Sequence, residues 1–205
     1  MKDLMLVIDV QNVYFPGQPW ACPSLPRTVN NIKMLLDSPA CGRKFDVLFT
    51  QYLAAKEPKG RWAQYNAEYR EINEDPDLSE IAGSLKPYLD KWPVCDKHTY
   101  SSCYIPEIRE AISRYDRILL TGVVAECCIL ATMTSLIDEG AHVCYLKDAI
   151  SGQSQEWEDM IEKIAASFAP IHTEVLSAEE YLGIAEKLSE NFSKESNTLS
   201  ATDRS

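Results

Sequence analysis

Short apolar runs alternate along this chain with stretches that repeat apolar residues at helical spacing, and this alternation constrains the fold most. Continuous apolar runs of five to seven residues are typical of strands buried on both faces. The predicted strands are Leu4–Val10, Phe45–Thr50, Val94–His98, Arg117–Thr121, His142–Leu146 and Ile171–Leu176. The predicted helices are Pro26–Leu36, Pro106–Tyr115, Cys128–Asp138, Trp157–Phe168 and Ala178–Leu188. The alternation predicts an α/β fold, with a parallel sheet covered by helices on both sides.

Two segments depart from this alternation. Residues 54–92 are polar and aromatic, with turn signals such as KEPKGRW and NEDPDLSE, and a long insertion of this kind often forms a lid or a pocket wall. From residue 190 onward the chain is polar and rich in serine, which predicts a disordered tail over residues 190–205. A length of 205 residues suits a single core, so we expect one domain over residues 1–189.

The charge balance argues against several classes of partner. The chain has 20 Lys and Arg against 31 Asp and Glu, a formal net charge of −11. An acidic surface repels phosphate backbones and anionic lipids, so we expect neither nucleic acid nor a membrane as partner. The beginning of the chain lacks the pattern of a signal peptide. Seven cysteines at irregular spacing, without a CxxC pair, predict free thiols, and together these features predict a cytoplasmic protein.

Three polar residues are predicted to meet at one edge of the sheet. Asp9 ends the first strand, Lys97 ends the third, and Cys128 follows the fourth at the start of a helix. In open α/β sheets, ligands bind at the carboxyl ends of the strands. Each residue alone has an ordinary structural explanation, but a carboxylate, a cation and a thiol at successive strand ends favour nucleophilic catalysis. A nearby lysine and a helix N-terminus favour the thiolate, so we expect the pKa of Cys128 to lie below the ordinary thiol value.

The segments around these residues resemble the isochorismatase-like cysteine hydrolases, a family that includes nicotinamidases and N-carbamoylsarcosine and ureidoacrylate hydrolases. The resemblance runs from about Leu4 to Leu182. LMLVIDVQNVYF resembles the family's first strand with its catalytic aspartate, and KHTYSSCY its lysine segment, although Cys103 stands where an aromatic residue is usual. TGVVAECCILAT resembles the nucleophile segment, in a register that places the nucleophile at Cys128 rather than at Cys127.

This resemblance implies a three-layer α-β-α fold, with a Rossmann-like six-stranded parallel sheet in the order 3-2-1-4-5-6. It implies catalytic roles for Asp9, Lys97 and Cys128, and a cis peptide between Val123 and Val124. The N–H groups of Val124 and Cys128 would form the oxyanion hole. Relatives commonly form dimers or tetramers, so a homo-oligomer is expected.

Departures from the family pattern bear on the metal. Metal-dependent nicotinamidases carry Asp-x-His after the second strand, whereas this chain reads FTQYLAA, with Tyr52 and Ala54 at those places. The histidines at 98, 142 and 172 are not spaced as ligands, and His98 is interpreted as a bystander beside Lys97. We therefore expect neither a metal nor another cofactor.

The resulting hypothesis is a metal-independent amidohydrolase that cleaves a small amide, ureide or carbamoyl compound through a Cys128 thioester. The alternatives are a vinyl-ether hydrolase of the isochorismatase type, a nicotinamidase, or a non-catalytic binding domain. Candidate substrate-binding residues are Tyr14, Phe15, Gln51, Tyr52, Trp62 and Tyr104. Trp20, Tyr65 and Tyr69 are further aromatic residues expected near the mouth of the site.

Overall fold

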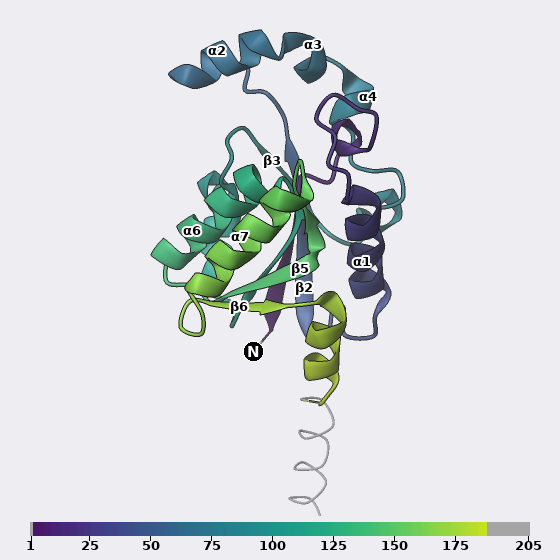
Figure 1. Ribbon diagram of the computed structural model, residues 1–205, viewed down its shortest axis with the longest axis vertical. Coiled ribbons are helices and arrows are strands. Elements are labelled where there is room, and N and C mark those ends of the chain that lie inside the picture. The colour runs from purple at the N-terminus through teal and green to yellow at the C-terminus, as the bar shows by residue number, and fades with distance from the viewer. Residues whose placement is uncertain (1, 188–205) are drawn as a thin grey trace, which may run out of the picture.

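The computed structural model describes residues 2–187, which are organised around one six-stranded sheet (Figure 1). The strands are β1 (Asp3–Ile8), β2 (Phe45–Tyr52), β3 (Val94–Lys97), β4 (Ile118–Val123), β5 (Val143–Ser151) and β6 (Thr173–Leu176). Every neighbouring pair is parallel, and the order across the sheet is β3-β2-β1-β4-β5-β6. The predicted fold class and strand order are confirmed.

Helices cover both faces of the sheet because side chains of a strand point alternately to the two sides. In β1, Met5 and Val7 join the core beneath α1 (Leu25–Asp37), together with Tyr181 from the helical residues 178–187. Leu4, Leu6 and Ile8 face the opposite core, which is covered by α5 (Pro106–Ile112), α6 (Leu130–Asp138) and α7 (Gln155–Ser167). Figure 1 shows α1 on one side of the sheet and α6 and α7 on the other.

α1 and α7 differ from the predicted boundaries by one or two residues, and two other helices differ in ways that change the local structure. α5 ends at Ile112 and not at Tyr115. The helix after β4 was expected to begin at Cys128, but a π-helical turn, η4 (Ala125–Ile129), comes first and the regular α-helix α6 begins at Leu130. Cys128 therefore lies inside a widened turn, a feature that occurs frequently at functional sites.

The insertion forms short helices at the carboxyl ends of the strands, at the top of Figure 1. They are α2 (Arg61–Glu68), α3 (Arg70–Asn73) and α4 (Pro76–Ser79). The 3₁₀ turn η2 (Lys86–Tyr88) lies instead near the C-terminal end of α1, where the Tyr88 hydroxyl donates to Asp37 at 2.6 Å; two further 3₁₀ turns are η1 (Asn12–Tyr14) and η3 (Ser102–Tyr104). The buried Gln11 side chain donates to the carbonyls of Tyr52 at 3.0 Å and Ser79 at 2.7 Å, and accepts from the Tyr52 N–H at 2.9 Å. Gln11 thus fastens the insertion to the ends of β1 and β2.

The predicted C-terminal tail and the possibility of a membrane-spanning helix remain to be considered. The tail predicted at residues 190–205 lies outside the described residues. Across residues 2–187, no helix has the length and apolar character that a bilayer crossing requires.

Candidate active site

Asp9 follows β1 directly, and its backbone turns sharply there. Its φ is +51°, in the left-handed region that aspartate tolerates better than most residues. The residue is fully buried, its N–H donates to the Thr50 carbonyl at 3.2 Å, and its Oδ1 accepts from the Thr50 hydroxyl at 2.7 Å. Thr50 therefore holds one carboxylate oxygen and leaves Oδ2 for other groups.

Gly122 lets β4 run close beside the last residue of β1. A Cβ at this position would lie 2.1 Å from the Ile8 carbonyl oxygen, and the φ of Gly122 is +106°. No other residue type fits such a conformation against a backbone neighbour. The glycine in the TGVV segment thereby brings the residues after β4 next to Asp9.

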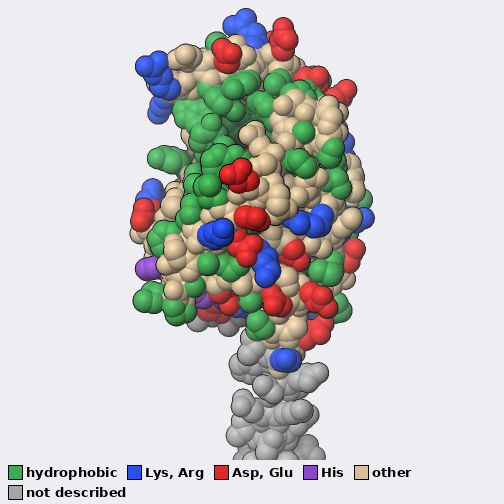
Figure 2. Space-filling view, viewed as in Figure 1, with side chains coloured by type: hydrophobic (Ala, Val, Ile, Leu, Met, Phe, Trp, Pro, Cys, Tyr) green, Lys and Arg blue, Asp and Glu red, His purple; other side chains and the backbone are tan. Residues whose placement is uncertain are grey.

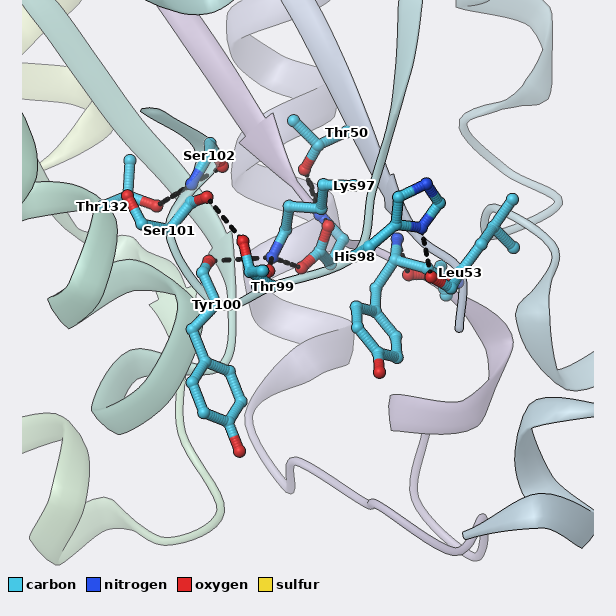
Figure 3. A network of polar contacts seen from close by, with 12 residues as sticks. Thr50, Leu53, Lys97, His98, Thr99, Tyr100, Ser101, Ser102 and Thr132 are labelled. Carbon is cyan, nitrogen blue, oxygen red and sulfur yellow. Dashed lines mark hydrogen bonds and ion pairs between the residues drawn. The ribbon is translucent and has the colours of Figure 1, made fainter. Parts of the chain in front are cut away.

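Lys97 ends β3 and forms a buried ion pair with Asp9. Its Nζ lies 2.6 Å from Asp9 Oδ2, with side-chain exposures of 1% and 0%. The ammonium also donates to the carbonyls of Thr99 at 3.0 Å and Tyr100 at 2.9 Å, and Figure 3 shows these contacts. Burial alone would lower the pKa of Lys97, but the Asp9 carboxylate and the Cys128 sulfur raise it, so the lysine stays charged.

Cys128 lies in η4, and only 4% of it is exposed. The Val123–Val124 peptide bond just before this turn is cis, and Val124 is extended. Burial raises the pKa of the thiol to about 12; the charge of Asp9 adds to the rise and that of Lys97 opposes it. The expected lowering of the pKa is therefore wrong. Lys97 is neutralised by Asp9 and cannot offset the cost of burying a thiolate, so the resting thiol is neutral.

Cys127 contacts the same region but differs from Cys128 in its environment. It is half-buried, and burial followed by the charge of Glu126 raises the pKa of its thiol. Asp9 is not among the charges that act on it. Of these two adjacent thiols, Cys128 is the one that both members of the buried ion pair influence.

A cavity of about 400 Å³ opens over Cys128. Its lining residues come from five parts of the chain, namely the segment after β1, the insertion, and the segments after β3, β4 and β5. They are Tyr14, Pro19, Trp20, Tyr65, Tyr69, Ile72, Tyr100, Val124, Cys127, Cys128 and Gln153. Figure 2 shows hydrophobic side chains gathered in a hollow below the segment that holds α2 and α3. A small molecule in this cavity would contact Cys128 at the base and aromatic rings at the sides.

The family profile described as "Isochorismatase domain" matches residues 3–175, from β1 into β6. The chain belongs to the isochorismatase domain family. An uncharacterized isochorismatase family protein of Bacillus subtilis, YddQ, is 28% identical over 167 residues, covering 78% of this chain and 84% of that protein.

Solved structures of this family share the fold. A cysteine hydrolase from Pseudomonas syringae superposes with a TM-score of 0.77 and 20% identity, over 91% of this chain and 93% of that one. N-carbamoylsarcosine amidase from Thermoplasma acidophilum superposes with a TM-score of 0.65 and 19% identity, over 88% of this chain and 98% of that one. The protein is thus an isochorismatase-family hydrolase, and at 19–20% identity these structures share its fold without defining its substrate.

The structure of this isochorismatase-family protein places the candidate binding residues in different environments. Tyr14 lines the cavity. Trp62 and Tyr52 lie behind the wall, where the Trp62 ring centroid is 5.2 Å from that of Tyr65 and the buried Tyr52 ring is 6.5 Å from it. Neither is among the lining residues, so these two side chains support the rings that are.

Three other candidates lie apart from the cavity. Phe15 packs against the core beneath α1. The Gln51 side chain donates to the Ser79 carbonyl at 2.8 Å and so holds the insertion in place. Tyr104 is 78% exposed and lines a separate hollow with Arg109 and Glu139. Its expected place among the aromatic residues at the mouth is therefore wrong, because η3 turns it away towards α5 and α6.

Sequence reasoning missed three residues of the site. Thr50 positions Asp9 through its hydroxyl. The position of Thr50 at the end of a predicted strand could have indicated that it lies near the site. Tyr100 and Gln153 line the cavity. Gln153 could not be placed because β5 was predicted to end at Leu146, whereas it continues to Ser151 and carries the following loop to the site.

His98 was interpreted as a bystander beside Lys97, and no metal was expected. His98 is exposed and its Nδ1 lies 2.7 Å from the Leu53 carbonyl oxygen (Figure 3). Within residues 2–187 there is no group of three or more His, Cys, Asp or Glu side chains placed to hold a metal ion. Metal independence remains a prediction about activity.

Proposed function

We propose that this isochorismatase-family hydrolase is a cysteine amidohydrolase. It would cleave the C–N bond of a small amide, ureide or carbamoyl compound through a thioester on Cys128, without a metal. The observation that carries the proposal is the buried Asp9–Lys97 ion pair next to a thiol at the base of an aromatic cavity. A carboxylate next to a neutral thiol can accept the thiol proton, and so act as the general base that activates the sulfur.

The first half of the reaction forms the thioester. The carbonyl carbon of the substrate approaches Sγ of Cys128, and Asp9 Oδ2 accepts the thiol proton as the S–C bond forms. Transfer during attack removes the need for a resting thiolate, which the raised pKa of about 12 makes scarce. The N–H groups of Val124 and Cys128 are proposed to stabilise the oxyanion. Asp9 then returns the proton to the nitrogen, and the C–N bond breaks to release ammonia or an amine.

The second half regenerates the thiol. A water molecule enters the place of the departed amine, and Asp9 takes its proton while the oxygen attacks the thioester carbonyl. The C–S bond breaks, the sulfur recovers a proton from Asp9, and the carboxylic or carbamic acid leaves. Throughout, Lys97 holds the Asp9 carboxylate in place by the 2.6 Å contact.

The proposal is tested by an ammonia-release screen over small amides, ureides and carbamoyl compounds. We expect turnover to be lost in Cys128→Ser and kept in Cys41→Ser, a matched change of a half-buried thiol that lies outside the cavity. Mass mapping of acid-quenched enzyme should find the acyl group on Cys128 and not on Cys127. Full activity in Cys128→Ala would refute the thioester and favour a vinyl-ether hydrolase with Asp9 as the acid.

The homo-oligomer expected from the resemblance also enters here as a proposal. Light scattering coupled to size-exclusion chromatography would distinguish a dimer or tetramer from a 23.1 kDa monomer.

A further inference from the structure

The wall of the cavity is aromatic and continuous. The ring centroids of Tyr65 and Tyr69 are 4.8 Å apart, and Trp20 lies 5.6 Å from Tyr69 and 5.9 Å from Tyr14. Tyr100 continues this wall, with its ring centroid 6.3 Å from that of Tyr65. Five rings thus line the space above Cys128, and such rings pack well against a flat, weakly polar body.

The residues that line the cavity offer no positive charge to a bound ligand. None of the eleven residues that line the cavity carries a formal charge. The nearest ammonium is that of Lys97, which is buried against Asp9 and the carbonyls of Thr99 and Tyr100. A substrate carboxylate entering the cavity would therefore lose its water without gaining an ion-pair partner, which is strongly unfavourable.

The pKa values of two tyrosines that line the cavity are raised, which is consistent with surroundings that disfavour negative charge. Burial raises the pKa of Tyr14, and the neighbouring Cys128 and Asp9 raise it further. Burial also raises the pKa of Tyr100, to which Cys127 and Cys128 add. Surroundings that oppose negative charge on a phenol oppose it on a ligand as well.

Gln153 supplies the one carboxamide among the lining residues, and its backbone is held firmly. Its N–H donates to Glu126 Oε1 at 3.1 Å, and the preceding Gly152 N–H donates to Glu158 Oε1 at 3.0 Å. Glu158 is fixed in turn by an ion pair with Arg27 at 3.0 Å. The exposed Gln153 side chain forms no hydrogen bond with any residue in the part of the chain that the structure describes, so both its donor and its acceptor face the cavity rim unused.

We infer that this cavity accepts planar amides without a carboxylate and rejects amides that carry one, because its lining holds no cation, and that position 153 at the rim is where an added cation would reverse this preference. The inference rests on the proposed function for the identity of the reacting group. The charge preference itself rests on the lining residues and is measurable as binding, whether or not the bond is cleaved.

A matched ligand series tests the preference. Benzamide, 4-carboxybenzamide and 4-(trimethylammonio)benzamide share one ring and one amide and differ in the para substituent, which is hydrogen, an anion or a cation. Their dissociation constants for Cys128→Ala, measured by ligand-observed NMR, should favour the neutral amide over the anion by at least ~10²-fold. Binding of the anion as tight as that of benzamide, or tighter, would overturn the inference, whereas the cation, which adds similar bulk with the opposite charge, should not show this loss. Preferred binding of benzamide with no ammonia release from it by the wild-type enzyme would count against the proposed function at this substrate, but not against the charge preference.

A charge placed at the rim tests the role of Gln153. Gln153→Lys puts an ammonium where the carboxamide was and should tighten binding of 4-carboxybenzamide by about 10-fold, while benzamide changes little. Gln155→Lys is the matched control, because it adds the same charge two residues away, where the side chain bonds Asp159 and does not line the cavity. Equal gains in the two variants, or no gain in Gln153→Lys, would remove Gln153 from the specificity site.

Discussion

Replacing Asp9 by Asn should make Cys128 easier to alkylate while stopping turnover. The negative charge of Asp9 raises the pKa of Cys128, and Lys97 lowers it. In Asp9→Asn the first effect disappears, and the lysine ammonium loses the carboxylate that neutralised it. Both changes favour the thiolate, whereas the base that the reaction requires has been removed.

The magnitude follows from the charges. With a pKa of about 12, only about 10⁻⁵ of the Cys128 thiol is ionised at pH 7. A unit charge about 4 Å from a thiolate, in surroundings of effective dielectric about 20, changes its energy by about 4 kcal/mol. Removing such a charge corresponds to about three pKa units, or roughly a 10³-fold faster alkylation at pH 7. Loss of the general base should lower turnover by ~10²–10⁴-fold.

The assay is the rate of iodoacetamide labelling at Cys128, followed by peptide mass mapping between pH 6 and pH 10. Asp96→Asn is the matched control, since it removes the same charge from an exposed position on β3. Cys127, on whose pKa Lys97 acts but Asp9 does not, is the comparison thiol within each sample and should accelerate less than Cys128. Slower labelling of Cys128 in Asp9→Asn, or an equal acceleration at Cys127, would refute the reasoning.

Three further outcomes are expected. Lys97→Met removes the charge that lowers the pKa of Cys128, so the pH at which Cys128 alkylates should rise and turnover should fall at least ~10²-fold; near-normal values of both would remove Lys97 from the site. Gly122→Ala sets a Cβ 2.1 Å from the Ile8 carbonyl and should lower the free energy of unfolding by at least ~3 kcal/mol, measured by urea denaturation. Chelators should leave the rate of ammonia release unchanged, and stoichiometric metal that tracks activity would contradict this.

The sheet was predictable because its strands are short apolar runs buried on both faces. β5 shows where this signal ends. Its polar residues Lys147 and Asp148 interrupt the run, and the pairing with β4 shifts register there, from Leu120 with Tyr145 to Gly122 with Ile150. Asp148 is accommodated because it accepts from the Ala178 N–H at 2.8 Å, a long-range contact that no local pattern reveals.

The positions of Asp9, Lys97 and Cys128 were also predictable, since parallel strands bring their carboxyl ends to one edge. Their electrostatics were not. The pKa of Cys128 depends on how deeply the thiol is buried and on the cancellation of Lys97 by Asp9, and both depend on distances across three strands. Gln153 and Tyr100 were missed for a related reason, because loops, unlike strands, leave no periodic trace in the sequence.

The way in which Gln11 fastens the insertion has a consequence for how this scaffold can acquire new specificities. Gln11 and Gln51 both donate to the Ser79 carbonyl, so α4 is held at the ends of β1 and β2. α2 and α3, in contrast, contain no buried residue. Tyr69 is exposed, so its replacement should alter the aromatic wall at little cost to folding, whereas Tyr65 packs on the buried Tyr52 and Ile72 packs against the core. Within residues 61–73, changes of specificity are therefore expected to cost least at the exposed positions.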